Sequence, residues 1–125
     1  MANEITLSGS LAVAKGSLQS EALSVSGLKA TLTGKEVIKA TQTIPTTAGG
    51  TALNLGGLGS VGWALIKNLD ATNYVDLLDA VSGTPIIRIP PGLSAGPFLF
   101  TPTVTAPAAL AHTASCDIEY EIAEI

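Results

Sequence analysis

Apolar and acidic residues alternate without interruption from Cys116 to Ile122. A period of two is the period of a β-strand, in which successive side chains point to opposite faces of the sheet. The segment therefore predicts a strand with one apolar, buried face and one acidic face in solvent. A chain that contains such a strand must cover the apolar face with a second layer of structure.

Similar patterns recur along the chain, where β-branched residues alternate with small polar ones and Gly or Pro interrupts about every 8 to 12 residues, as in a sandwich or barrel. The one helical alternative, Pro107–His112, is alanine-rich but too short to be stable alone. The predicted strands are Glu4–Ala14, Ala22–Ser26, Leu28–Thr33, Glu36–Ile44, Ala52–Leu55, Val61–Asn68, Tyr74–Leu78, Pro85–Ile89, Phe98–Thr101, Val104–Ala106 and Cys116–Ile122.

Two of these strands carry further expectations. Val61–Asn68 has apolar residues of both parities, Trp63 and Leu65 against Ile66, so we expect a central strand with both faces covered. The polar residues that follow are turn formers, since Asn and Asp side chains bond their own backbone. Because Tyr74–Leu78 resumes the strand pattern after this turn, the stretch predicts a hairpin.

The length and the charge limit what the chain can be. Its 125 residues suit one domain, predicted to be a single sandwich over residues 1–125. Only 13% of the residues are charged, against about 25% in an ordinary soluble domain, which favours a surface that stays associated with partners. Residues 1–67 carry five lysines and three acids, and residues 68–125 carry Arg88 and seven acids.

Several classes of protein are disfavoured by the same composition. No cluster of basic residues with interleaved aromatics is present to bind nucleic acid. No run approaches the roughly 20 apolar residues of a membrane helix, and the first ten residues do not resemble a secretion signal. The single cysteine, Cys116, excludes an internal disulfide.

His112 and Cys116 are the one histidine and the one cysteine of the chain, four residues apart. A thiol nucleophile needs a base in contact with it. On a strand, this spacing separates the two side chains by about 13 Å, and only a turn at Thr113 or Ala114 could bring them together. Two ligands are also too few for zinc. We expect a buried thiol and a loop histidine.

Two other stretches invite a ligand-binding interpretation. Asp70, Asn73, Asp76 and Asp79 could supply oxygen ligands to calcium, but the glycine and final glutamate of an EF-hand loop are missing, and we expect Asp76 and Asp79 to face solvent. The run Gly56-Gly57-Leu58-Gly59 lacks the Lys-Ser or Lys-Thr of a phosphate-binding loop. The sequence thus predicts no catalytic, cofactor-binding or metal-binding residue, and no enzyme.

Two segments resemble small structural proteins of tailed-bacteriophage virions. They are Trp63–Val75, with its Lys-Asn-Leu-Asp-Ala-Thr-Asn-Tyr-Val turn, and Pro85–Gly92; the loop Gln42–Gly50 is similar too. The resemblance implies a β-sandwich of jelly-roll type that serves as a component of the particle. Asp76-Leu77-Leu78-Asp79 after the tyrosine departs from the pattern, which implies a longer arm there. The family carries no catalytic residues to transfer.

Three roles remain open for such a domain. The small size and low charge favour a decoration (cement) protein on the outside of the head. It would bind the major capsid protein or another virion protein and copies of itself, with a trimer favoured, and would reside in virions assembled in the host cytoplasm. A tail or baseplate component is the second role. A receptor- or glycan-binding module is the third, although the five aromatic residues are expected to lie mostly in the core.

Overall fold

The computed structural model describes residues 5–11, 14–19, 23–30 and 36–124. Within these ranges the regular structure is all strand, and the strand pairs are antiparallel. No helix in them has the length and apolarity needed to cross a membrane. The chain divides into two compact units, Met1–Thr33 and Gly34–Ile125. The all-β, antiparallel class predicted from the alternation is confirmed.

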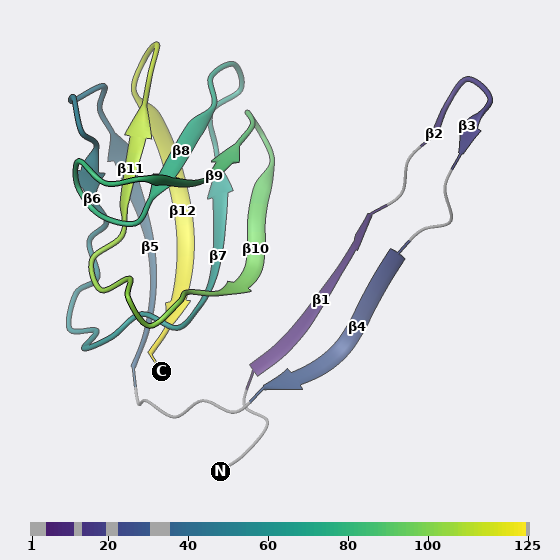
Figure 1. Cartoon of the computed structure of the whole chain (residues 1–125), viewed down its shortest axis with the longest axis horizontal. Helices are drawn as coiled ribbons and strands as arrows, with labels where there is room; N and C mark the ends of the chain where they lie inside the picture. The colour runs from purple at the N-terminus through teal and green to yellow at the C-terminus, as the bar shows by residue number, and fades with distance from the viewer. Residues whose placement is uncertain (1–4, 12–13, 20–22, 31–35, 125) are drawn as a thin grey trace. The chain divides into compact units, whose positions relative to one another are not determined.

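The first unit is a long two-stranded ribbon (Figure 1). β1 (Ile5–Leu11) pairs with β4 (Leu23–Ala30), and the short β2 (Ala14–Lys15) pairs with β3 (Leu18–Gln19). The register shifts between Leu7 and Gly9, which pair with Leu28 and Val25, so the extra residue of this bulge lies on β4. β4 continues through Gly27, where the sequence predicted a break between two strands, because glycine holds its positive φ of 65° without strain. We call β1 and β4 the N-terminal ribbon.

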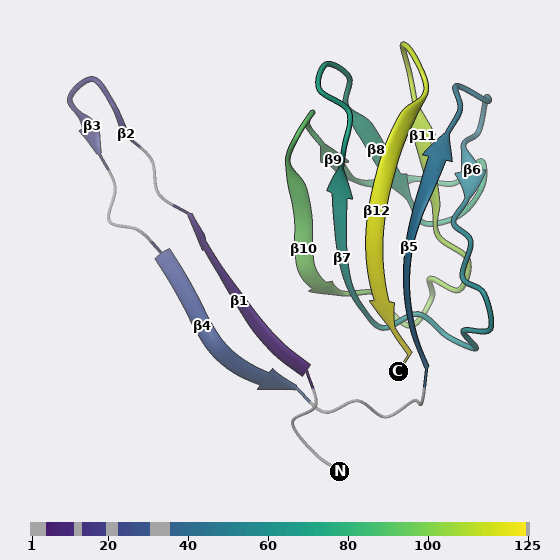
Figure 2. The ribbon, with the colours of Figure 1, turned by 180° about the vertical axis from the view of Figure 1, so that it is seen from behind.

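The second unit consists of two four-stranded sheets (Figures 1 and 2). The first sheet has the order β10-β7-β12-β5 and the second the order β6-β11-β8-β9. The strands are β5 (Val37–Ile44), β6 (Thr51–Ala52), β7 (Trp63–Asn68), β8 (Val75–Leu78), β9 (Pro85–Ile89), β10 (Ser94–Leu99), β11 (Ala108–Ala111) and β12 (Cys116–Ala123).

The order of pairing identifies the topology. The outermost strands in sequence, β5 and β12, are neighbours, and so in turn are β6 with β11, β7 with β10 and β8 with β9. The chain therefore folds as one long nested hairpin distributed over two sheets, which is the jelly-roll arrangement of eight strands. The sequence assigned residues 1–125 to one sandwich, whereas the strands of this jelly-roll unit lie between Val37 and Ala123.

A single hydrophobic core draws on both sheets of the jelly-roll unit. The first sheet contributes one face of β12, where burial alternates as the sequence predicted, and the second contributes Val75 and Leu77 of β8. Such a shared core is what a two-layer β-sandwich requires. The buried members are Ile44, Leu53, Val61, Ala64, Ile66, Val75, Leu77, Ile89, Ala95, Phe100, Val104, Ala109, Ala111, Cys116, Ile118, Tyr120 and Ile122.

The hairpin predicted around the Asn68–Asn73 turn is wrong. β7 lies in the first sheet and β8 in the second, so the loop between them crosses from one sheet to the other. The turn chemistry was identified correctly, but turn residues report only that the chain changes direction. Which strand pairs with which is decided by the distant partners β10, β12, β11 and β9.

The strand predicted at Val104–Ala106 is absent from the described structure, and β11 occupies Ala108–Ala111 instead. Alanine favours a helix when local preference alone decides. Here the segment pairs with β6 on one side and β8 on the other, and Ala109 and Ala111 enter the core. Two backbone ladders thus override the weak helical preference, as tertiary context commonly does.

Trp63 was expected in a strand covered on both faces. In the structure, burial alternates along β7, and Trp63 and Leu65 lie on its outer face, opposite the buried Ala64 and Ile66. Trp63 is half-buried and pairs across the ladder with Leu99. Of the five aromatic residues, Phe100 and Tyr120 are buried in the core and Phe98 packs against it, whereas Trp63 and Tyr74 are half-buried.

We expect Trp63→Ala to lower the free energy of unfolding by about 1–2 kcal/mol, because part of the side chain is already in water. Phe100→Ala, at a buried aromatic, is the matched comparison and should cost about 3–5 kcal/mol. Urea denaturation of the two variants measures both values. A loss at Trp63 that equals the loss at Phe100 would contradict the half-buried placement.

Candidate functional site

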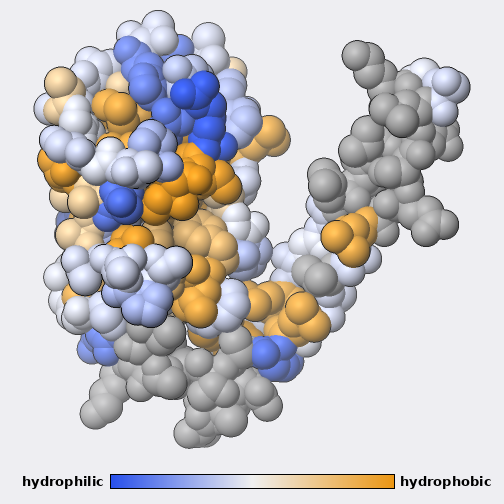
Figure 3. All heavy atoms as spheres, in the orientation of Figure 1, coloured by the Kyte–Doolittle hydropathy of each residue, from blue (hydrophilic) through white to orange (hydrophobic). Residues whose placement is uncertain are grey.

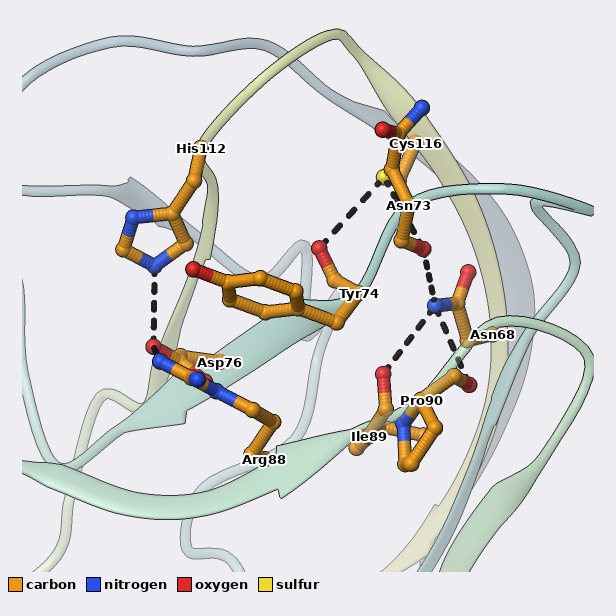
Figure 4. Close-up of polar contacts among 9 residues, drawn as sticks. All are labelled: Asn68, Asn73, Tyr74, Asp76, Arg88, Ile89, Pro90, His112 and Cys116. Carbon is orange, nitrogen blue, oxygen red and sulfur yellow. Dashed lines mark hydrogen bonds and ion pairs between the residues drawn. The ribbon is translucent and has the colours of Figure 1, made fainter.

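The loop after β7 is organised by the side chain of Asn68, which is buried. Its Nδ2 group donates to the carbonyl oxygens of Asn73 at 2.8 Å, Ile89 at 3.1 Å and Pro90 at 3.3 Å (Figure 4). Its Oδ1 accepts from the backbone N–H of Asp70 at 2.9 Å. Since Ile89 ends β9, this one amide joins the two sheets where the chain crosses between them.

The side chain of Asp70 stabilises the same loop by hydrogen bonds to its backbone. Its Oδ2 accepts hydrogen bonds from the backbone N–H groups of Thr72 and Asn73. The Asn73 N–H, with a smaller contribution from Thr72, lowers the pKa of this carboxyl, since both bonds favour the charged form. These hydrogen bonds hold the loop in one conformation and so fix the position of Tyr74 and of the start of β8.

Asp76 is the centre of a polar cluster on the second sheet. It lies opposite Arg88 in the ladder of β8 with β9, and His112 directly follows β11 on the other side of β8. The Arg88 Nε and Nη2 groups donate to Oδ1 and Oδ2 of Asp76 at 2.8 and 3.1 Å, and His112 Nε2 lies 2.8 Å from Oδ2 (Figure 4). Three neighbouring strands therefore place one group each.

Tyr74 completes this Asp76 cluster. The guanidinium carbon of Arg88 lies 3.8 Å from the centroid of the Tyr74 ring, within the range of a cation–π contact. The rings of Tyr74 and His112 have their centroids 4.9 Å apart with an interplanar angle of 37°. The Asp76 side chain is 6% exposed, against 57% for Arg88, so the carboxylate is covered and the guanidinium reaches solvent.

The electrostatics follow from this geometry. The hydrogen bonds from Arg88 lower the pKa of Asp76, with a smaller contribution from His112, although burial acts in the opposite direction. Asp76 also raises the pKa of Arg88. An ionised carboxylate only accepts hydrogen bonds, so the Nε2 atom of His112 carries the hydrogen in this contact. The His112 ring is thus oriented by a buried charge.

The oxygen ligands proposed for calcium are engaged separately. Asp76 was expected in solvent and is instead buried, because Arg88 and His112 are available to neutralise and cover it. Asp79 accepts the backbone N–H of Thr84 at 2.7 Å and closes the turn between β8 and β9. In the described parts of the chain, no three His, Cys, Asp or Glu residues gather in a metal-binding group.

The structure gives His112 and Cys116 different partners. The Cys116 thiol is fully buried and lies 3.6 Å from the Ala114 carbonyl oxygen and 3.8 Å from those of Asn73 and Tyr74. Burial raises its pKa, and so do the charges of Asp70 and Asp117. A thiol held in the protonated form is a poor nucleophile. The His112 ring forms its hydrogen bond with Asp76.

The glycine run that was compared with a phosphate loop meets an acidic group. The backbone N–H of Gly59 donates to Oε2 of Glu124 at 2.9 Å, and Gly56 donates to the Asn54 side chain at 3.0 Å. A carboxylate beside these N–H groups repels a phosphate. Gly56 also has a positive φ of 57°, which explains a glycine at this turn.

A sequence signal for the Asp76 cluster did exist. Arg88 is the one cation among residues 68–125, and Ser82-Gly83 marks a turn between two predicted strands. A hairpin centred on Ser82 sets Asp76 opposite Arg88, which is the observed register. The contribution of His112 could not be found in this way, because β11 was not predicted.

Comparison with protein-family models, with curated proteins and with solved structures finds no match to this chain. The fold is therefore assigned from the order of its strands, and the site from its own geometry. In the Asp76 cluster on the second sheet, the negative charge of Asp76 is neutralised by Arg88, and the His112 ring is held in one orientation by its hydrogen bond to Asp76. The residues of the Asp76 cluster contact one another through hydrogen bonds, an ion pair between Asp76 and Arg88, and ring contacts. These contacts join neighbouring strands of the second sheet and the residues beside them.

Proposed function

We propose that this chain is a non-enzymatic structural protein of a tailed-bacteriophage virion, and more specifically a decoration (cement) protein on the outside of the head. Its partners are further copies of itself, with a trimer favoured, and the major capsid protein or another virion protein. The phage assignment rests on the resemblance of Trp63–Val75 and Pro85–Gly92 to that family. The assembly role rests on observations of the molecule.

The N-terminal ribbon is the observation that carries the assembly role. It forms a sheet of its own with two strands. An isolated two-stranded ribbon is marginally stable in water and needs a third strand or another surface to cover it. Leu23 and Leu28 of β4 are 74% and 51% exposed. A ribbon with such exposed apolar side chains is suited to binding a partner.

The surface of the jelly-roll unit supports the same role. Large apolar side chains are exposed at several places on both sheets, and few charges separate them. Exposed apolar patches of this kind mark contact surfaces more often than they serve a free monomer. The exposed large apolar residues of this unit are Val37, Leu65, Leu69, Val81, Ile86, Ile87, Leu93 and Leu99.

Two alternatives use the same fold. A tail or baseplate component would need the same self-association and differs only in its site on the particle. A receptor- or glycan-binding module would need an open aromatic platform. Phe100 and Tyr120 are buried and the Tyr74 ring is covered by Arg88, which weighs against that module.

The test is binding to the undecorated heads of the phage that encodes the chain. The intact chain should co-sediment with heads, whereas a variant that lacks residues 1–33 should keep its β-type circular dichroism and bind at least ten-fold more weakly. Isolated tails serve as the matched particle. Binding to tails rather than heads would replace the decoration role by the tail role, and binding to neither particle would contradict the virion assignment.

A further inference from the structure

An apolar cleft opens between the edge strands of the two sheets. β9 ends the second sheet and β10 ends the first, and the cleft between them has a volume of about 420 Å³. Apolar residues gather at and below β9 on the face shown in Figure 3. Ile86 and Ile87 are 46% and 40% exposed. The lining consists of Ile86, Ile87, Gly96, Pro97 and Phe98, and none of these side chains is charged or polar.

The backbone beside the cleft limits how an occupant can bind. Proline has no N–H to donate to an added strand, and β9 begins at Pro85 while β10 contains Pro97. The ladder of β10 with β7 is also irregular between Ala95 and Phe98. Edges interrupted in this way resist the addition of another strand. An occupant therefore binds through apolar side chains placed in the cleft.

The N-terminal ribbon presents side chains of the matching kind. Cross-strand partners lie on one face of a sheet, and faces alternate along each strand. The register pairs Leu7 with Leu28 and Thr6 with Lys29, whose Nζ donates to the Thr6 hydroxyl oxygen at 2.7 Å. Ile5, Leu7 and Leu28 thus share an apolar face, opposite a polar face with Thr6 and Lys29. Burying that apolar face in the cleft would strand no charge.

We propose that the cleft between β9 and β10 receives the apolar face of the N-terminal ribbon of a second copy of this chain. The inference rests on the proposed assembly function and names the surface that performs it. Every copy carries one ribbon and one cleft, so the contact is heterologous and closes a dimer or a ring when each copy both gives and receives a ribbon.

The area that the ribbon can bury requires this exchange. The seven residues of β1 span about 24 Å and the ribbon is about 10 Å wide, so one contact buries at most roughly 500 Å² over the two partners. A specific interface needs about 1,000 Å² or more. In a reciprocal pair the two contacts together reach about 1,000 Å², and in a closed ring each copy is held by two contacts, whereas a single open contact falls short.

The experiment uses five variants of the intact chain, each followed by sedimentation velocity. Leu28→Asp places a charge on the apolar face of the ribbon, and Ile86→Asp places one in the cleft; Ile86→Ser is a milder second cleft variant. Ser24→Asp on the ribbon and Thr105→Asp in the loop before β11 are matched controls at exposed polar positions. Circular dichroism verifies that each variant is folded.

We expect the unmodified chain and the two controls to form the same oligomer, and Leu28→Asp and Ile86→Asp each to raise the dissociation constant at least ten-fold. A mixture of the two variants should associate several-fold more tightly than either alone, because the ribbon of one and the cleft of the other are intact. This partial rescue in a mixture requires contact between different copies.

The other outcomes separate the two proposals. If Leu28→Asp prevents assembly while Ile86→Asp and Ile86→Ser do not, the ribbon drives assembly through another surface, and the inference about the cleft is overturned. The same holds if the mixture shows no rescue. If the unmodified chain is a monomer, or no variant changes the oligomer, both the cleft contact and the ribbon-driven assembly are overturned.

Discussion

Replacing Ile118 by alanine is expected to lower the free energy of unfolding by about 3–4 kcal/mol. Ile118 is fully buried in the core, on the strand that lies between β5 and β7 of the first sheet. Removing three carbons there leaves a cavity that closely packed neighbours fill only partly. A domain is typically stable by about 5–15 kcal/mol, so the loss is a large share of the total.

The neighbouring residue provides the control for this prediction. Glu119 lies on the outer face of β12, and its carboxylate is 3.9 Å from Lys67 Nζ. Exposed ion pairs contribute little, so Glu119→Ala should change the stability by about 0.5 kcal/mol or less. Urea denaturation of both variants makes the comparison. Equal losses at the two positions would mean that the alternate burial along β12 is wrong.

Asp76→Asn is expected to cost about 1–2 kcal/mol at pH 7, since it removes the charge that Arg88 and His112 contact. This loss of stability is smaller than that for a fully buried ion pair because Arg88 is largely in solvent. The pKa of Asp76 is lowered in the folded protein, so its contribution is complete above the unfolded pKa of about 3.9. That contribution is lost as the pH falls through the folded value.

The difference in stability between the unmodified chain and Asp76→Asn should therefore shrink when the pH is lowered from 7 to 3. Denaturation midpoints at pH 7, 5 and 3 measure it. Glu121→Gln, at an exposed acidic position of β12, is the control and should stay within about 0.5 kcal/mol of the unmodified chain at pH 7. A difference for Asp76→Asn that does not change with pH would contradict a role of the charge.

The strands that sequence reasoning located well are those with local signals. Pro85–Ile89 was predicted with its observed bounds, because a turn precedes it and Pro90 ends it. The prediction of Glu36–Ile44 differs from β5 by one residue, and that of Cys116–Ile122 from β12 by one. In these segments, alternation and proline act on neighbours in the sequence, so no distant contact is needed to recognise them.

The errors lie where distant contacts decide. β11 forms because two other strands pair with an alanine-rich segment, and β7 and β8 separate into different sheets because of partners up to 58 residues away. Asp76 was assigned to solvent because an isolated acid usually is there, and His112 reaches it only through β11. The candidate site could therefore be predicted in part, as the pair of Asp76 and Arg88.

The nested pairing of the strands also sets an order of events during synthesis. β5 is made long before β12, yet it is paired along its whole length with β12, from Val37 opposite Ala123 to Ile44 opposite Cys116. Until Cys116–Ala123 has left the ribosome, the first sheet lacks the strand that joins β5 to β7. Folding dominated by such distant pairs is slow. The two strands of the N-terminal ribbon are close in sequence and can pair much earlier. In the proposed mode of assembly, the ribbon therefore forms before the cleft between β9 and β10 that receives it.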